Sequence, residues 1–599
     1  MFFRHPITQL IKLKEHGVKI LLLFLSFILT AETSNGQGFL RADGKRIVNE
    51  KGENVLLRGM GLGGWMLQEG YMLKIYRDGQ QNKIRSKISD LIGEKQTQQF
   101  YDMWLANHTR KIDIDSMKAW GFNSVRLPMH YNLYTLPIEE EPVAGENTWL
   151  EKGFQMTDSL LAWCKANQMY LILDLHAAPG GQGSDLNIAD GDTPKPNLWQ
   201  SEANKQKTIA LWRKLADRYK NEPWIGAYDI INEPNWGFQD PINDKNGTKE
   251  QKNEPLNKLL RDITKAIREV DTKHLIIIEG NGWGNNYNGI TPDWDKNMAV
   301  SFHKYWNFND TQSISHILKM RERHNIPVWL GETGENSNVW FTEAIRLLET
   351  NNIGWAWWPL KKIGINNPME IKSNLNYDRV VNYINGREGA SKPKESDAFS
   401  GLMELATHLK LENTVIHRDV LDAMFRQPFS NEAKPFKQHI IAENTTIQAV
   451  DYDLGRNGVA YFDKDTANYR VSTGKASSGN KGGFYRNDGV DIRKDSTLYD
   501  RYFVSDIEDG EWLQYTIDVK EAGNFTLKIR LASDNDDGKL SIRSNGTPVG
   551  KHISVPNTGS LKSFKIIELK NIPVKAGKQT LEIHADTGGF SFSSLQFIK

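Results

Sequence analysis

Eight short apolar runs, each followed by a helix-like stretch, recur between about residues 55 and 362 and constrain the fold more than any other feature. Runs that lack polar alternation are typical of strands buried on both faces, as in a parallel sheet. Eight such runs alternating with helices predict a (β/α)8 barrel. The rival is a doubly wound open sheet, which usually carries a glycine-rich phosphate loop after an early strand, and no convincing loop of that kind is present. The runs lie at 55–65, 124–130, 170–178, 225–234, 275–283, 298–306, 327–336 and 353–362.

The pattern changes after the eighth run. Helical patterns continue to about residue 430, and a polar stretch with two prolines, PFSNEAKPFKQ at 428–438, indicates a linker. Short alternating strands separated by turns then reach the end of the chain. We therefore predict a barrel domain over 38–430, a linker over 431–445 and an all-β jelly-roll sandwich over 446–599.

The first 37 residues resemble an export signal. Basic residues precede the apolar run ILLLFLSFIL at 20–29, and small and polar residues follow it. The run is short for a membrane span, so we expect a cleaved signal peptide over 1–37 and a secreted, extracellular or periplasmic protein with no stable membrane span. The single cysteine, Cys164, lies in a helical pattern and excludes a disulfide within the chain.

Charge and composition restrict the ligand. The net charge of the 599 residues is +1, which provides no field to attract nucleic acid. The 18 Trp and 19 Tyr supply flat faces for core packing or for the apolar faces of sugars. We expect a neutral ligand, no nucleic acid and a monomeric chain.

Polar residues stand where the apolar runs end. In a barrel of this kind the carboxyl ends of all strands meet at one mouth, where the active site lies. The residues placed there are Arg126, His176, Asn232, Glu233, His303, Tyr305, Glu332 and Trp358.

The two acids in this set favour one reaction class. Metal-assisted hydrolysis requires a denser set of ligands, and neither HxH nor HExxH occurs, so we expect no metal and no cofactor. Glycoside hydrolysis uses two carboxylates directly. We predict that Glu233 donates the proton, that Arg126 keeps Glu332 ionised, that Asn232 holds a sugar 2-hydroxyl and that Trp358 forms a floor under the sugar. The structural alternative is that both acids are buried ion-pair partners of Arg126.

The barrel region, about residues 40–365, resembles glycoside hydrolase family 5, a retaining family of clan A. The motifs, in family order, are RGMGLGGW, GFNSVRLPMHY, LILDLHAAPGG, INEPNW, HKYW, GETGE and GWAWWPLK. The resemblance implies that Glu233 is the acid/base and Glu332 the nucleophile. It further implies that the sugar next to the cleaved bond is surrounded by Arg126, His176, Asn232, His303, Tyr305 and Trp358.

Two motifs, LGGWMLQEGYM and HAAPGGQ, are most similar to the branch of the family that contains exo-1,3-β-glucanases. In that branch the residue matching Glu69 contacts the terminal sugar. The expected function is therefore a secreted retaining hydrolase of a β-glucan, with a preference for β-1,3 linkages. A β-1,4-glucanase (cellulase), a β-mannanase, a transglycosylase and a non-catalytic glycan-binding protein on the same scaffold remain alternatives.

The last 150 or so residues are similar to a family 6 carbohydrate-binding module, through runs such as IQAVDYD, DGEWLQYTIDV and AGKQTLEIHADTGGFSF. Tyr485 matches the sugar-stacking Tyr of that family. Leu561 and Ser591 stand where a Trp and an Asn are usual, and Val450 replaces an acid associated with structural calcium. Three alternatives stay open for this module: weak sugar binding at Tyr485, binding on another face, and a bracing role beside the barrel. A structural calcium ion in the module also stays open, with one of its usual ligands replaced.

Overall fold

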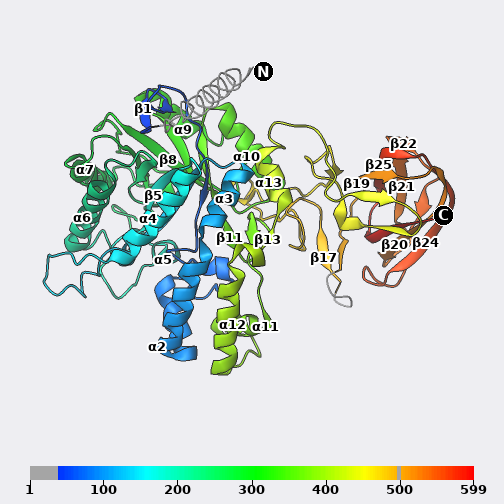
Figure 1. Ribbon diagram of the computed structural model, residues 1–599, viewed down its shortest axis with the longest axis horizontal. Helices are drawn as coiled ribbons and strands as arrows, with labels where there is room; N and C mark the ends of the chain where they lie inside the picture. Colours follow the sequence, from blue (N-terminus) through cyan, green and yellow to red (C-terminus); the bar gives the residue numbers. More distant parts are fainter. Residues whose placement is uncertain (1–37, 496–500) are drawn as a thin grey trace, which may run out of the picture.

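A closed barrel of eight parallel strands forms the centre of the larger domain (Figure 1). The computed structural model describes residues 38–495 and 501–599. Each strand pairs with the next in chain order, and the last pairs back with the first, which confirms the predicted barrel. The strands are β3 (Arg58–Gly61), β4 (Ser124–His130), β5 (Tyr170–Ala177), β6 (Ile225–Asp229), β7 (Leu275–Ile278), β8 (Met298–Lys304), β9 (Val328–Gly334) and β10 (Gly354–Trp358).

Amphipathic helices surround the barrel and pack their apolar faces on it in one continuous core. Ser201 and Ser337 cap two of them with side-chain oxygens that accept hydrogen bonds from the first turn. A hairpin of β1 (Arg41–Asp43) and β2 (Arg46–Val48) precedes the first barrel strand. The helices that alternate with the strands include α3 (Lys111–Trp120), α4 (Glu151–Ala166), α6 (Glu202–Tyr219), α7 (Glu254–Arg268), α9 (Ser315–His324) and α10 (Asn338–Thr350).

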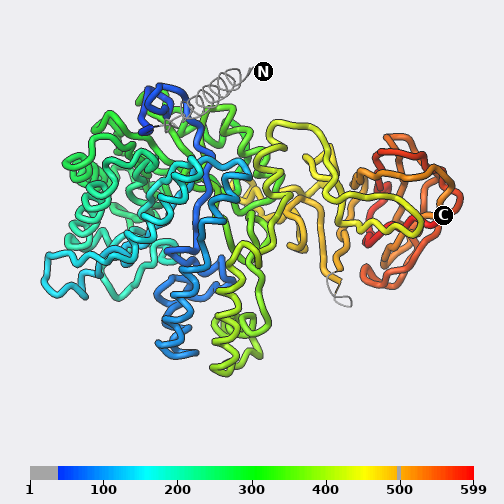
Figure 2. Tube along the Cα trace, viewed as in Figure 1, coloured from blue at the N-terminus to red at the C-terminus, as the bar shows by residue number. Residues whose placement is uncertain are grey.

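Two helices far apart in the sequence form a separate layer beside the barrel. The helices α2 (Gln81–His108) and α12 (Glu395–His408) lie side by side (Figure 2). They share a second core with α11 (Leu375–Ile384). The helix α13 (Arg418–Phe425) packs on α10, where the hydroxyl of Thr342 donates to the carbonyl of Ala423.

The C-terminal region is a β-sandwich with its own core. Alternating buried and partly buried residues along its long strands place one face of each sheet inward. One sheet contains β14 (His439–Ile441), β16 (Tyr461–Phe462), β19 (Trp512–Val519), β21 (Lys539–Ser544), β22 (Thr547–Pro548), β23 (Ile553–Ser554) and β25 (Gly577–Thr587). The other contains β15 (Thr445–Gln448), β17 (Ile492–Lys494), β18 (Tyr502–Val504), β20 (Gly523–Ser533), β24 (Lys565–Val574) and β26 (Phe590–Ile598).

The predicted linker, 431–445, is wrong in its extent. Strand β14 lies within it and pairs in parallel with β19, so the sandwich begins before residue 446. Its residues alternate buried, exposed and buried, because one face of this short edge strand covers the sandwich core. The polar flanking sequence concealed this pattern.

The predicted signal peptide, 1–37, lies outside the described residues. Within residues 38–495 and 501–599, no helix combines the length and the apolar character that crossing a bilayer requires.

Candidate active site

The carboxyl ends of the barrel strands open into a cleft with a volume of about 880 Å³. Seven of the predicted site residues line it: Glu69, His176, Glu233, His303, Tyr305, Glu332 and Trp358. Arg126 and Asn232 lie beneath them, fully or almost fully buried. The structure thus brings the nine predicted barrel-site residues to one place.

Glu332, on β9, is held by two donors. Nη1 of Arg126 lies 3.0 Å from its Oε2, and the hydroxyl of Tyr305 donates to its Oε1 at 2.8 Å. A cation and a phenol that both donate to one carboxylate stabilise its charged form. Both carboxylate oxygens of Glu332 thus face hydrogen-bond donors, which fix the orientation of the group in the cleft.

Glu233 follows β6 in a strained backbone conformation, with φ of 43°. Its N–H donates to Glu279 at 2.7 Å, and Nδ1 of His303 lies 2.6 Å from its Oε1. Burial, followed by the negative charges of Glu332 and Glu279, raises the pKa of Glu233 above its ordinary value, although His303 opposes this shift. The side chain is therefore suited to holding a proton.

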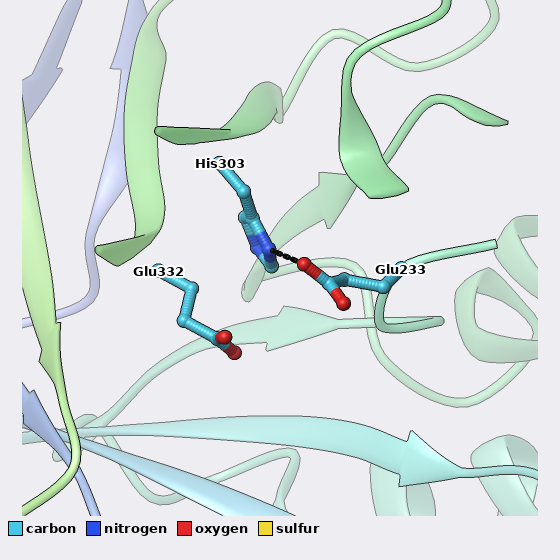
Figure 3. A group of neighbouring side chains, drawn as sticks. All are labelled: Glu233, His303 and Glu332. Atoms are coloured by element: carbon cyan, nitrogen blue, oxygen red, sulfur yellow. Dashed lines mark hydrogen bonds and ion pairs between the residues drawn. The ribbon is translucent and has the colours of Figure 1, made fainter. Parts of the chain in front are cut away.

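The carboxylates of Glu233 and Glu332 approach each other from opposite sides of His303 (Figure 3). One oxygen of each, together with a ring nitrogen of His303, all lie within 4.8 Å of one another. Retaining glycosidases hold their two carboxyl groups about 5 Å apart, whereas inverting enzymes separate them by roughly 6.5–9.5 Å. The observed spacing matches the shorter class.

A buried network of opposite charges supports the pair from below. The guanidinium of Arg126 contacts Asp229 at 2.9 Å, Asp174 at 3.2 Å and Glu279 at 3.2 Å. Sequence reasoning missed these three acids, although each lies within or directly after an apolar run and could have been found by that position. They neutralise Arg126, which could not otherwise be buried at low cost.

Glu279, directly after β7, has the most central place among the missed residues. It is fully buried and contacts both the backbone of Glu233 and Nε2 of His303, the latter at 3.1 Å. Burial favours the neutral imidazole, but Glu279 and Glu233 outweigh it and raise the pKa of His303 well above its usual range. His303 therefore lies between two carboxyl groups that both raise its pKa.

An aromatic wall lies on another side of the cleft. The rings of Trp358 and His176 stack with centroids 4.9 Å apart and planes 8° apart. Trp358 donates from Nε1 to the hydroxyl of Tyr71, which sequence reasoning also missed, at 2.9 Å. A Cβ at Gly61 would lie 2.4 Å from the Trp358 ring, so the glycines of RGMGLGGW leave the space that this ring fills.

Glu69 faces His176 at 3.7 Å between its Oε1 and Nε2. Burial raises the pKa of Glu69 to about 7, against the opposing effect of His176. Burial opposes the charge of His176, but Asp174 and Glu69 outweigh it and raise the pKa of His176 to about 10. Asn232 directs its side-chain nitrogen at the same imidazole, 3.3 Å away.

Glu233, His303 and Glu332 also form the only group in 38–495 and 501–599 whose side chains are spaced to offer three metal ligands. Both nitrogens of His303 are already hydrogen-bonded to carboxylates. A metal ion would have to displace one of these contacts to reach a ring nitrogen. The donor set is therefore better suited to proton transfer than to metal binding.

Tyr485, the predicted sugar-binding residue of the C-terminal module, has φ of 70° and a half-buried ring. Its hydroxyl donates to Asp451, and its ring lies 5.0 Å from that of Tyr502. Sugar binding at Tyr485 stays a prediction.

A closed (β/α)8 barrel whose mouth presents two facing carboxylates and stacked aromatic rings defines a class, that of carbohydrate-active barrel proteins. Comparison with known families agrees. Residues 78–363 match the model of cellulase (glycosyl hydrolase family 5), and residues 483–599 match that of carbohydrate binding module (family 6). The barrel region thus matches glycosyl hydrolase family 5, and the C-terminal region matches a family 6 carbohydrate-binding module.

Curated relatives share the barrel region. A beta-xylosidase from Phanerodontia chrysosporium is 29% identical over 45% of this chain and 52% of its own length. Endoglucanase C from Acetivibrio thermocellus is 32% identical over 34% of this chain and 52% of its own. A probable glucan 1,3-beta-glucosidase A from Aspergillus niger is 27% identical over 30% of this chain and 41% of its own length. The chain spans about half the length of the curated relatives it matches.

Solved structures are similar at low identity. Endoglucanase Cel5A from Thermotoga maritima is 21% identical with a TM-score of 0.34, over 42% of this chain and 82% of that one. A beta-glucanase from Saccharophagus degradans is 15% identical with a TM-score of 0.37, over 62% of this chain and 93% of that one.

Proposed function

We propose that this chain is a retaining β-glycoside hydrolase that cleaves a β-glucan. The observation that carries the proposal is the approach of the Glu233 and Glu332 carboxylates to within 4.8 Å, with a raised pKa at Glu233. Glu332 accepts hydrogen bonds from Arg126 and Tyr305, whereas the raised pKa of Glu233 suits a proton donor, and these are the two roles that double displacement requires.

In the first step, Glu332 attacks the anomeric carbon while Glu233 gives its proton to the departing oxygen. The bond from the anomeric carbon to that oxygen breaks as the ester to Glu332 forms. In the second step, Glu233 removes a proton from water, and the water oxygen displaces Glu332. Arg126 and Tyr305 stabilise the Glu332 carboxylate before the first step and as it departs in the second.

Within this class we propose a preference for β-1,3-linked glucan. Support comes from the position of Glu69 in the cleft, beside His176, where it can contact a terminal sugar. The alternative substrates to compare directly are β-1,4-glucan and β-mannan. The names of the relatives, which span xylosidase, endoglucanase and 1,3-glucosidase, add xylan to this comparison.

The first experiment measures reducing ends released from laminarin, cellulose, mixed-linkage glucan, mannan and xylan. Proton NMR of the earliest product then reports its anomeric configuration. We expect the β-anomer first, from a β-1,3-linked substrate. An α-anomer would contradict retention, products longer than the starting oligomer would indicate transglycosylation, and no release from any substrate with binding intact would favour a non-catalytic protein.

The second experiment separates the two acids. Glu332→Gln should reduce kcat by about 10⁴-fold or more on every substrate, because no nucleophile remains. Glu233→Gln should lose comparable activity on natural glycosides but retain much of the first step on a dinitrophenyl glycoside, whose leaving group needs no proton. The control is Glu222→Gln. Glu222 precedes β6 and lies at the amino ends of the barrel strands, away from the cleft. Equal losses for Glu233→Gln on both substrate types would refute its role as the acid.

A further inference from the structure

A segment of the C-terminal module reaches the substrate cleft of the barrel. This segment, residues 466–473, includes the short helix α14 (Arg470–Thr473). Arg470 and Val471 line the same cleft as Glu233 and Glu332. The cleft is therefore built from both domains.

Polar contacts fix the segment on the loop that follows β9. The hydroxyl of Ser337 donates to the carbonyl of Thr466 at 2.6 Å. Asn336 and Asn468 exchange two hydrogen bonds, of 2.8 and 2.9 Å. The segment thus adjoins the strand that carries Glu332.

A buried polar network holds the rest of the module in place. Asn338, at the start of α10, donates to Asp419 of α13 at 2.8 Å and to Asp488 of the module at 2.9 Å. The backbone N–H of Asn487 donates to Asp419 at 2.7 Å. These groups are almost fully buried, so breaking the contact would leave several of them unpaired. Figure 1 shows the module beside α10 and α13.

The guanidinium of Arg470 lies over the ring of Trp306, with its carbon 3.7 Å from the ring centroid. The N–H of Val471 donates to the carbonyl of Trp306 at 2.9 Å. Trp306 follows Tyr305, whose hydroxyl contacts Glu332. Arg470 therefore covers one face of Trp306, the residue that directly follows Tyr305 of the proposed active site.

The donors of Arg470 are free for a ligand. Among the described residues, its guanidinium has no hydrogen-bond or ion-pair partner, and its contact with the Trp306 ring uses none of its N–H donors. An arginine in a cleft with unused donors is suited to binding hydroxyl oxygens of a sugar.

We propose that Arg470 and Val471 of the C-terminal module, seated on Trp306, form a subsite for a sugar residue of the substrate chain beyond the two sugars that flank the cleaved bond. The module thereby acts as part of the substrate cleft. This inference rests on the proposed function for the identity of the ligand as a glycan.

The test compares full-length wild type with Arg470→Ala and Arg470→Lys on oligosaccharides of increasing length. Arg470→Ala should leave the shortest cleaved substrate unaffected and reduce kcat/KM on longer ones by roughly 5- to 50-fold, mainly through KM. Arg470→Lys keeps the charge but loses the planar stacking, so we expect an intermediate loss. Arg543→Ala, an exposed arginine on β21, is the matched control and should match wild type at every length.

Equal losses at all lengths would indicate a purely structural role and overturn the subsite, as would no loss at any length. Titration calorimetry with the same oligosaccharides separates this inference from the proposed function. If the wild type binds but cleaves none of them, and Arg470→Ala weakens binding of the longer ones, the subsite stands and the hydrolase proposal falls. If the wild type neither binds nor cleaves, both fall.

Discussion

Nδ1 of His303 lies 2.6 Å from Oε1 of Glu233, and Nε2 of the same ring lies 3.1 Å from Glu279. His303 therefore connects the proposed proton donor to a fully buried carboxylate that no substrate reaches. Burial raises the pKa of Glu233, and His303 lowers it through its hydrogen bond and its charge.

Replacing His303 with glutamine should move the basic limb of the pH–activity profile to higher pH. Activity needs protonated Glu233 and is lost as pH rises through its pKa, and removing the imidazolium removes an effect that lowers that pKa. The measurement is kcat/KM against pH on an unactivated substrate. His324→Gln, on the outer helix α9, is the control. A basic limb that stays in place or moves to lower pH would contradict the assigned coupling.

Glu279→Gln should reduce kcat by roughly 10- to 100-fold, because it removes a charged acceptor from Arg126, His303 and the Glu233 backbone. KM should change little, since Glu279 does not line the cleft. Steady-state kinetics give the two constants separately. A large rise in KM at constant kcat would show that Glu279 acts on substrate binding instead.

Gly61→Ala should impair activity and stability through Trp358. The added methyl would lie 2.4 Å from the ring, and relieving such a contact costs about 1–3 kcal/mol in a packed site. Displacing Trp358 also disturbs its stack on His176. Thermal unfolding and KM are the measurements. Gly523→Ala is the matched control, because the nearest neighbour of its added methyl is the flexible end of Lys599 at 3.3 Å. A lowered Tm with an unchanged KM would show that the position of the Trp358 ring matters for stability but not for substrate binding.

Asp463→Asn should stabilise the C-terminal module near pH 8 and have little effect near pH 4. Burial, with Glu511 and Asp491 nearby, raises the pKa of Asp463 to about 8. Its folded-state pKa lies above its unfolded value, so stability is lost as pH rises between the two values, and asparagine removes that loss. The amide oxygen can still accept the hydrogen bond from the N–H of Asp465.

Differential scanning calorimetry of the Asp463→Asn variant at both pH values gives the test. Asp537→Asn, at an exposed position of the same module, is its control. A gain in Tm that is equal at both pH values would show that the carboxyl group does not titrate in this range.

The apolar runs predicted the barrel because strands buried on both faces carry a local signal that needs no knowledge of their partners. Both acids of the proposed pair were found for the same reason, since each ends such a run. The linker was wrong because β14 has three residues and lies among polar neighbours, so the pattern that marks a strand is too short to recognise.

The amino-acid sequence alone determined the barrel, the sandwich and the places of Glu233 and Glu332 at the strand ends, because periodicity and strand-end position are local properties. Only the tertiary structure decided what these acids contact. Asp174, Asp229 and Glu279 meet at Arg126 because barrel closure brings separate strands together. Arg470 covers Trp306 because a second domain docks beside the mouth. Contacts between residues distant in the chain depend on packing geometry, which no short stretch of sequence encodes.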